Sequence, residues 1–227
     1  MTMFIGIQRN DKLIIGADSA VCVGDGVTNK RLREDYFDKL FTAHGMLFFI
    51  GGRVDFSKRV KDFIFHDSIT LDELQAFCNK TCKELNITDE IQEVSVWLNE
   101  CGEMTHYSLN SSKDGSFTPY RNVIKEDAEL LTRGFKSEEA LSKACNKYYK
   151  TSAKDGKIYP YEVIKETFDE IACPEVGGVC KLVIMECRNE TGVNINEHFY
   201  LIKDKYNIAD KETLISSLNK YLDERRF

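Results

Sequence analysis

The chain lacks several features that mark other classes of protein. It has no run of about 18 apolar residues, so we expect no transmembrane helix. No charged stretch followed by a long apolar run opens the sequence, so we expect no signal peptide. Its net charge of −6 comes from interspersed acidic and basic residues, whereas a general nucleic-acid binder needs a basic surface to neutralise phosphates.

Metal and disulfide motifs are missing as well. The eight cysteines include no CxxC pair, and only four histidines accompany them. Cys78 and Cys82 are four residues apart, and Cys173, Cys180 and Cys187 are spaced by seven around a Gly-Gly turn. These spacings do not match structural zinc sites, so we expect free thiols, no metal and no cofactor. Reduced thiols without an export signal indicate a cytoplasmic protein.

Length and composition fit one globular domain over residues 1–227. The sequence is 42% hydrophobic and 30% charged, as in soluble globular proteins. A core of this size buries roughly 70% of the surface of the unfolded chain, so no covalent or metal crosslink is required.

Apolar patterns predict strands in runs, separated by pairs of helices. Thr70, with Glu73 three residues later, is expected to form a capping box at the start of a helix. Residues 23–35 have two glycines and several charges, which predicts an exposed loop or ragged hairpin. The expected strands are 3–7, 12–19, 36–43, 46–50, 93–100, 103–110, 116–120, 128–134, 179–187 and 196–203. The expected helices are 53–67, 69–85, 138–150, 161–172 and 209–226.

This order of elements predicts an α+β fold of two stacked antiparallel sheets. Runs of strands alternating with helix pairs do not suit βαβ units. They suit sheets packed face to face, with the helix pairs outside. The strands at 3–7 and 46–50 are almost continuously apolar, as expected for strands buried on both faces.

The stretch TMFIGIQRNDKLIIGADSA, residues 2–20, resembles the mature start of proteasome β-type subunits. It also resembles the peptidase subunit of the bacterial ATP-dependent two-component protease. Both are N-terminal-nucleophile (Ntn) hydrolases with a four-layer αββα fold. The expected element order matches that fold over nearly the whole chain, while the sequence motifs are concentrated in the first 55 residues.

The resemblance implies four site residues. Thr2 falls on the N-terminal nucleophile, provided that Met1 is removed. Asp18, in GADS, falls on the aspartate that ends the second strand, and Lys39, in FDKLF, falls on the active-site lysine of the third strand. Gly51, in FFIGGRVD, falls on the glycine whose backbone N–H is the oxyanion donor.

These residue types suit amide hydrolysis. A threonine hydroxyl is a poor nucleophile and needs a base, which a free α-amine with a pKa of about 7.7–8.0 supplies. A lysine beside that amine favours its neutral form and stabilises the alkoxide, and a carboxylate such as Asp18 holds the lysine charged and in place. A backbone N–H at the Gly-Gly turn stabilises the tetrahedral oxyanion by a few kcal/mol.

The chain departs from the family in a late Ser/Asp/Ser set around the nucleophile. The first serine belongs to a Gly-Ser-Gly-Ser strand end, but this segment reads LLTRGFKS, with Thr132 or Arg133 in its place. The other two residues precede a Gly-Gly turn, but ACPEVGG has Cys173 and Val176 there. Arg133 adds a cation and bulk near the nucleophile, and Ser137 matches poorly as a substitute. The bacterial two-component peptidase also lacks part of this set.

The favoured function is therefore a threonine peptidase subunit that acts on peptides or unfolded proteins inside a homo-oligomeric ring. Any ATP-dependent unfoldase that it needs is a separate partner, and no nucleic-acid or membrane partner is expected. The alternative is a non-catalytic, proteasome-like scaffold or assembly protein that kept the fold. A third hypothesis, hydrolysis of a small amide, is less favoured because Thr2 replaces the Cys or Ser nucleophile.

Overall fold

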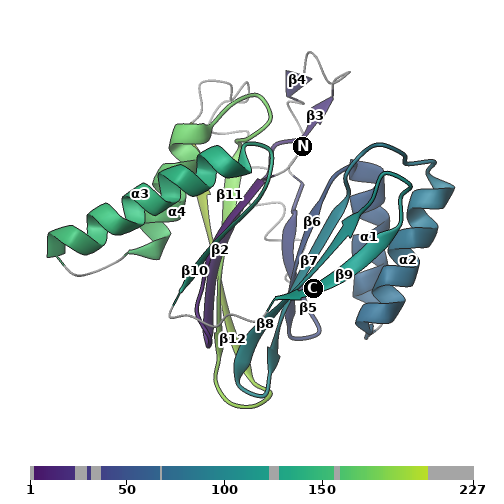
Figure 1. Ribbon diagram of the computed structural model, residues 1–227, viewed down its shortest axis with the longest axis horizontal. Helices are drawn as coiled ribbons and strands as arrows, with labels where there is room; N and C mark the ends of the chain where they lie inside the picture. The colour runs from purple at the N-terminus through teal and green to yellow at the C-terminus, as the bar shows by residue number, and fades with distance from the viewer. Residues whose placement is uncertain are drawn as a thin grey trace.

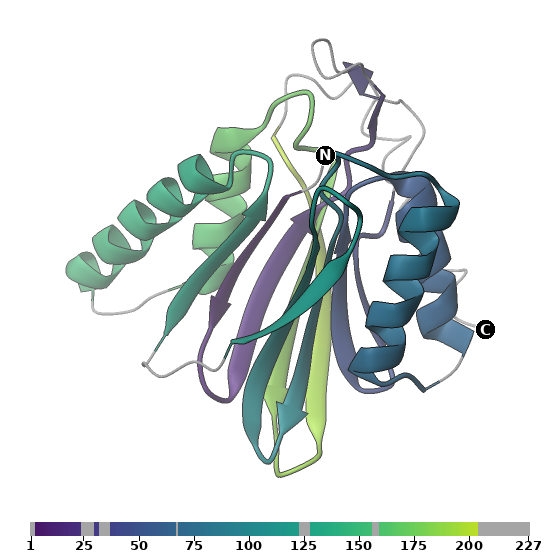
Figure 2. The same ribbon diagram turned by 45° about the vertical axis from the view of Figure 1, so that its right-hand side comes forward.

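The computed structural model describes residues 3–23, 30–31, 37–66, 68–122, 128–155 and 159–203. Thr2 and the helix expected at 209–226 lie outside these residues. The described chain forms four layers, in which two sheets lie face to face between two pairs of helices (Figures 1 and 2). The prediction of an α+β sandwich of antiparallel sheets is confirmed.

The first sheet has the strand order β10-β1-β2-β11-β12, and every neighbouring pair is antiparallel. Helices α3 and α4 cover its outer face (Figure 1). The elements of this half are β1 (Met3–Gln8), β2 (Lys12–Asp18), β10 (Glu129–Gly134), α3 (Ser137–Asp155), α4 (Pro160–Ile171), β11 (Val179–Cys187) and β12 (Val193–Leu201).

The second sheet has the order β5-β6-β7-β8-β9, again antiparallel, with α1 and α2 on its outer face. A short ribbon of β3 (Cys22–Val23) and β4 (Lys30–Arg31) lies apart from both sheets. The other elements are β5 (Leu40–Ala43), β6 (Met46–Gly51), α1 (Val54–His66), α2 (Leu71–Glu84), β7 (Glu93–Glu100), β8 (Glu103–Ser111) and β9 (Phe117–Asn122).

Three apolar layers hold this arrangement together. Met3 and Ile5 on one face of β1 pack toward α3 and α4, while Phe4 on its other face packs against Phe49 and Trp97 between the sheets. A third cluster fills the space between the second sheet and α1 and α2. All six residues of β1 are buried, which explains its lack of apolar-polar alternation.

Most expected elements are observed within a few residues of their predicted ends. The Thr70–Glu73 capping box of α2 is present, with both of its reciprocal hydrogen bonds. The strand expected from residue 36 begins only at Leu40, so Lys39 precedes the strand instead of lying within it. The side chain of Lys39 crosses to the other sheet instead of joining the face of its own.

The hairpin tips tie the two sheets together at one end of the sandwich. The amide of Met104 donates to the carbonyl of Asn10 at 2.5 Å, and the side-chain amide of Asn99 donates to the carbonyl of Gly192 at 2.9 Å. The start of β1 and the ends of β2 and β6 lie at the opposite end. In the described part of the chain, every helix is too short or too polar to span a bilayer.

Candidate active site

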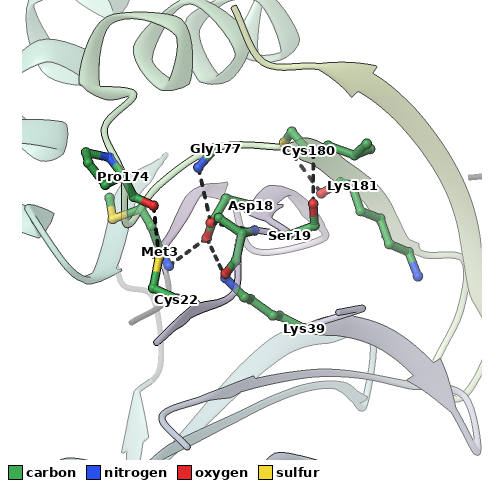
Figure 3. A network of polar contacts seen from close by, with 11 residues as sticks. Met3, Asp18, Ser19, Cys22, Lys39, Pro174, Gly177, Cys180 and Lys181 are labelled. Carbon is green, nitrogen blue, oxygen red and sulfur yellow. Dashed lines mark hydrogen bonds and ion pairs between the residues drawn. The ribbon is translucent and has the colours of Figure 1, made fainter. Parts of the chain in front are cut away.

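Asp18, the last residue of β2, is the centre of a buried polar network (Figure 3). Its Oδ1 accepts hydrogen bonds from the backbone amide of Met3 at 2.9 Å and from Nζ of Lys39 at 3.1 Å. Its Oδ2 accepts from the amides of Ala20, at 3.1 Å, and Gly177, at 3.4 Å. Only 1% of Asp18 is exposed, so these four donors supply the partners without which burying a carboxylate is costly.

Lys39 enters this network from the second sheet. Its ammonium group donates to Asp18 and also to the carbonyl oxygen of Ala20, at 2.8 Å. The residue is 4% exposed, so its ammonium group points into the protein and not into solvent. The pair with Asp18 thus joins the two sheets at the end where β1 begins (Figure 3).

Gly51 is the last residue of β6 and is buried at the same end of the sandwich. The amide of the preceding residue, Ile50, donates to the carbonyl of Lys39 at 2.9 Å, so Gly51 lies beside the backbone of the lysine. On its other side Gly51 is opposite Glu93 of β7.

The turn after Gly51 requires glycine at position 52. Gly52 has a φ of +117°, and a Cβ there would collide with the side-chain oxygen of Gln92. That same oxygen accepts a hydrogen bond from the amide of Arg53 at 2.7 Å. The Gly-Gly break is therefore held in one conformation by a side chain from the neighbouring segment.

Three of the four expected site residues, Asp18, Lys39 and Gly51, are thus brought to one end of the sandwich. Thr2 lies outside the described residues. Its neighbour Met3 is the residue whose amide binds Asp18, so the network includes the backbone directly after Thr2.

Sequence reasoning missed the contribution of Ser19 and the loop before β11. The hydroxyl of Ser19 accepts a hydrogen bond from the amide of Val179 at 2.8 Å. The amide of Ala20 donates to the carbonyl of Gly177 at 3.1 Å, and Gly178 has a φ of +78° with Ser19 Oγ filling the space of a Cβ. The Gly-Gly pair at 177–178 is the sequence signal for this contact between residues 19–20 and the loop before β11.

Two positions of the family's late set form a small backbone turn instead. Cys173 and Val176 are buried, and their amides and carbonyls exchange hydrogen bonds at 3.0 and 3.1 Å. Burial raises the pKa of the Cys173 thiol. The thiol of Cys22 donates to the carbonyl of Pro174 at 2.9 Å, which links the ribbon to this turn (Figure 3).

Arg133 reaches toward the second sheet from β10, where it is paired with Phe4. Its Nε lies 3.9 Å from Oε1 of Glu93, the residue opposite Gly51. Burial raises the pKa of Glu93 to about 7, although the charge of Arg133 and a hydrogen bond from Ser95 act to lower it. A second ion pair therefore joins the sheets near the candidate oxyanion donor.

None of the eight cysteines is in a disulfide. Burial raises the pKa of Cys180 and Cys78 far above the ordinary range, so these thiols are inert at neutral pH. The described residues contain no cluster of three His, Cys, Asp or Glu side chains suited to a metal ion.

No family model and no curated protein matches the sequence. Solved structures do match the fold. BPH from Thiobacillus denitrificans, in complex with epoxomicin, has a TM-score of 0.53 and 12% identity, covering 82% of this chain and 98% of that chain. The Anbu (Gly-1) mutant from Hyphomicrobium sp. strain MC1 has a TM-score of 0.53 and 12% identity, covering 100% of this chain and 95% of that chain. The chain therefore has the proteasome-like fold of Ntn hydrolases.

Proposed function

We propose that this protein is a threonine peptidase in which Thr2, exposed by removal of Met1, is the nucleophile. The observation that carries the proposal is the buried pair of Lys39 and Asp18, bound to the backbone amide of Met3. This pair gives the backbone next to Thr2 a fixed cation in a site shielded from water, where charge acts strongly.

The proposed reaction follows from these groups. The hydroxyl of Thr2 loses its proton to the free α-amine of the same residue as its oxygen attacks the carbonyl carbon of the substrate. The ammonium of Lys39 stabilises the developing alkoxide and favours the neutral form of the amine. The N–H of Gly51 binds the tetrahedral oxyanion.

Collapse of the tetrahedral intermediate breaks the C–N bond. The protonated amine returns its proton to the leaving nitrogen, and the acyl group stays on Thr2 as an ester. Water then attacks the ester, with the α-amine again accepting a proton, which releases the acid and restores the hydroxyl.

We extend the proposal to peptide or unfolded-protein substrates cleaved in a cytoplasmic homo-oligomeric ring, by resemblance to proteasome β-type subunits. The helix pairs α1–α2 and α3–α4 form the two outer layers and are available for contacts between subunits (Figure 2). An unfoldase, if the ring uses one, is a separate chain.

The test begins with the intact mass of protein purified from its native host, which shows whether Met1 is removed. The Met1-free protein is then treated with a peptide epoxyketone and digested to locate the adduct. We expect a single adduct at Thr2, formed from its hydroxyl and amine. The variant Thr2→Ala, also free of Met1, is the matched control and is expected to remain unlabelled.

The second candidate function is a non-catalytic scaffold. It is favoured by Arg133, Cys173 and Val176, which occupy positions of the late Ser/Asp/Ser set and which the structure uses for an ion pair and a backbone turn. An unlabelled Met1-free protein that still assembles into a ring would establish this alternative.

A further inference from the structure

Two consecutive residues, Asp38 and Lys39, bind neighbouring strands of the opposite sheet with opposite charges. Lys39 binds Asp18 at the end of β2. Both carboxylate oxygens of Asp38 lie 3.3 Å from Nζ of Lys181 in β11. The register places Lys181 opposite Ala17, so the two ion pairs are adjacent on the first sheet.

Lys181 and Lys39 enter the space between the sheets from opposite sides (Figure 3). The side chains of Lys181 and Asp38 are each 3% exposed. Each has a further ionic partner, because Glu197 of β12 lies 3.2 Å from Lys181 and Lys61 of α1 lies 3.4 Å from Asp38. Desolvating such charges costs more than packing apolar side chains of similar volume, so this network is poorly explained by stability alone.

We propose that Lys181 is a positioning residue of the candidate active site, which holds Asp38, and with it Lys39, against the first sheet and balances the charge around them. The inference rests on the proposed threonine peptidase function. It deepens that function by adding a second buried cation that sequence reasoning did not find.

The charge balance follows from the groups around Lys181. Among the described residues, these groups include the carboxylates of Asp18, Asp38 and Glu197 and the ammonium groups of Lys39 and Lys61. Removing the charge of Lys181 makes the electrostatic potential of this network more negative, which favours the protonated form of the α-amine proposed as the base. Removing the charge of Asp38 has the opposite effect.

The experiment measures the rate of epoxyketone labelling of Met1-free protein as a function of pH. For Lys181→Met we expect the acid limb of the profile to move up by about half a pH unit or more, which lowers the rate at neutral pH about threefold. For Asp38→Asn we expect the limb to move down by a similar amount, and the double variant should return it toward the wild-type position. A merely structural role would lower the rates without moving the limb in opposite directions.

Lys80→Met is the matched control, because Lys80 is an exposed lysine of α2 and solvent screens its charge. Its profile should coincide with that of the wild type. If Lys181→Met does not fold, Asp38→Asn and Glu197→Gln carry the test, and both should move the limb down.

The labelling results separate the role of Lys181 from the peptidase function on which it rests. Suppose that the wild type is labelled. If the acid limb of the folded variants then stays at the wild-type position, or moves the same way in Lys181→Met and Asp38→Asn, only the role of Lys181 is overturned. A Met1-free wild type that is never labelled overturns the peptidase function, and the role of Lys181 with it.

Discussion

Arg133 and Glu93 form an ion pair between the two sheets, with Nε of one 3.9 Å from Oε1 of the other. Glu93 is 8% exposed, whereas more than half of the Arg133 side chain is exposed. Within the described residues, this buried carboxyl thus has a single ionic partner, which is distant and well solvated and does not offset the cost of burying the charge. The pH dependence of stability should reveal this imbalance.

We expect Glu93→Gln to become more stable relative to the wild type as pH rises. Burial raises the pKa of Glu93 from 4.5 to about 7, so between these values the folded protein keeps a proton that the unfolded chain has released. Stability contributed by this group is present below that window and is lost as pH rises through it. Urea denaturation at about pH 5 and about pH 8 should show the difference in unfolding free energy changing by on the order of 1–3 kcal/mol.

Glu103→Gln, at an exposed position in β8, is the control for loss of a carboxylate. Its difference from the wild type should hardly change with pH. A Glu93→Gln difference that is equally constant would contradict the assignment of a proton to Glu93 in the folded state.

His106→Phe should stabilise the protein, and more so in acid. Within the described residues, neither ring nitrogen of His106 has a hydrogen-bond partner, while the ring stacks on Trp97 with centroids 4.5 Å apart. Phenylalanine keeps the stacking and removes the unsatisfied atoms, a gain of about 1–2 kcal/mol at neutral pH. Thermal unfolding of both proteins at neutral pH and in mild acid tests the expectation.

His106 changes the stability with pH in the opposite direction to Glu93. Burial, with the charge of Arg133, lowers the pKa of His106 from 6.5 to about 3. As pH falls between these two values, the unfolded chain binds a proton at His106 before the folded protein does. Stability that is present above this pH range is therefore lost as pH falls through it. Because the two residues change stability in opposite directions as pH changes, their effects partly cancel in the wild-type dependence of unfolding free energy on pH. If His106→Phe lost as much stability in acid as the wild type does, His106 would not contribute to the acid sensitivity.

Lys39→Met should abolish labelling at Thr2 while the protein stays folded. The ammonium is removed from the buried network, but Asp18 keeps its three backbone donors, Met3, Ala20 and Gly177. We expect a loss of labelling rate of roughly 100-fold or more. Mass spectrometry measures the labelling and circular dichroism the fold. Retained labelling would show that another group performs the role given to Lys39.

Thr70→Ala tests whether stability and reactivity can be separated. The variant removes the capping box of α2, which is on the outer layer far along the chain from the candidate site. We expect a loss of about 1 kcal/mol in unfolding free energy. Labelling rates at a temperature where both proteins are folded should be equal, and a large drop would couple the outer helices to the site.

Much of the fold is predictable because its signals are local. Continuous apolar runs predict β1 and β6, and turn residues at 10–12 and 101–102 predict the hairpins that join β1 to β2 and β7 to β8. The capping box at Thr70 is equally local. The predicted start of β5 is wrong, because Phe37 and Lys39 are residue types that suit a strand although the described strand begins at Leu40.

The rest of the site depends on how the two sheets are packed. Asp38 and Lys181 are 143 positions apart, and neither is conspicuous in its own segment. Lys39 can be assigned to the candidate active site by family resemblance because its segment has a recognisable motif, but no motif accompanies Lys181 or Glu93. Pairs of this kind become visible only when the register of β11 and the crossing of residues 38–39 are known.

The partners of Asp18 are mostly main-chain atoms. Amides of Met3, Ala20 and Gly177 bind it, and the carbonyl of Ala20 orients the ammonium beside it. Replacing the side chains of Met3 or Ala20 removes none of these atoms. The polar centre therefore depends on the course of the main chain more than on the identity of the residues that frame it, so it can tolerate amino-acid replacements at these positions.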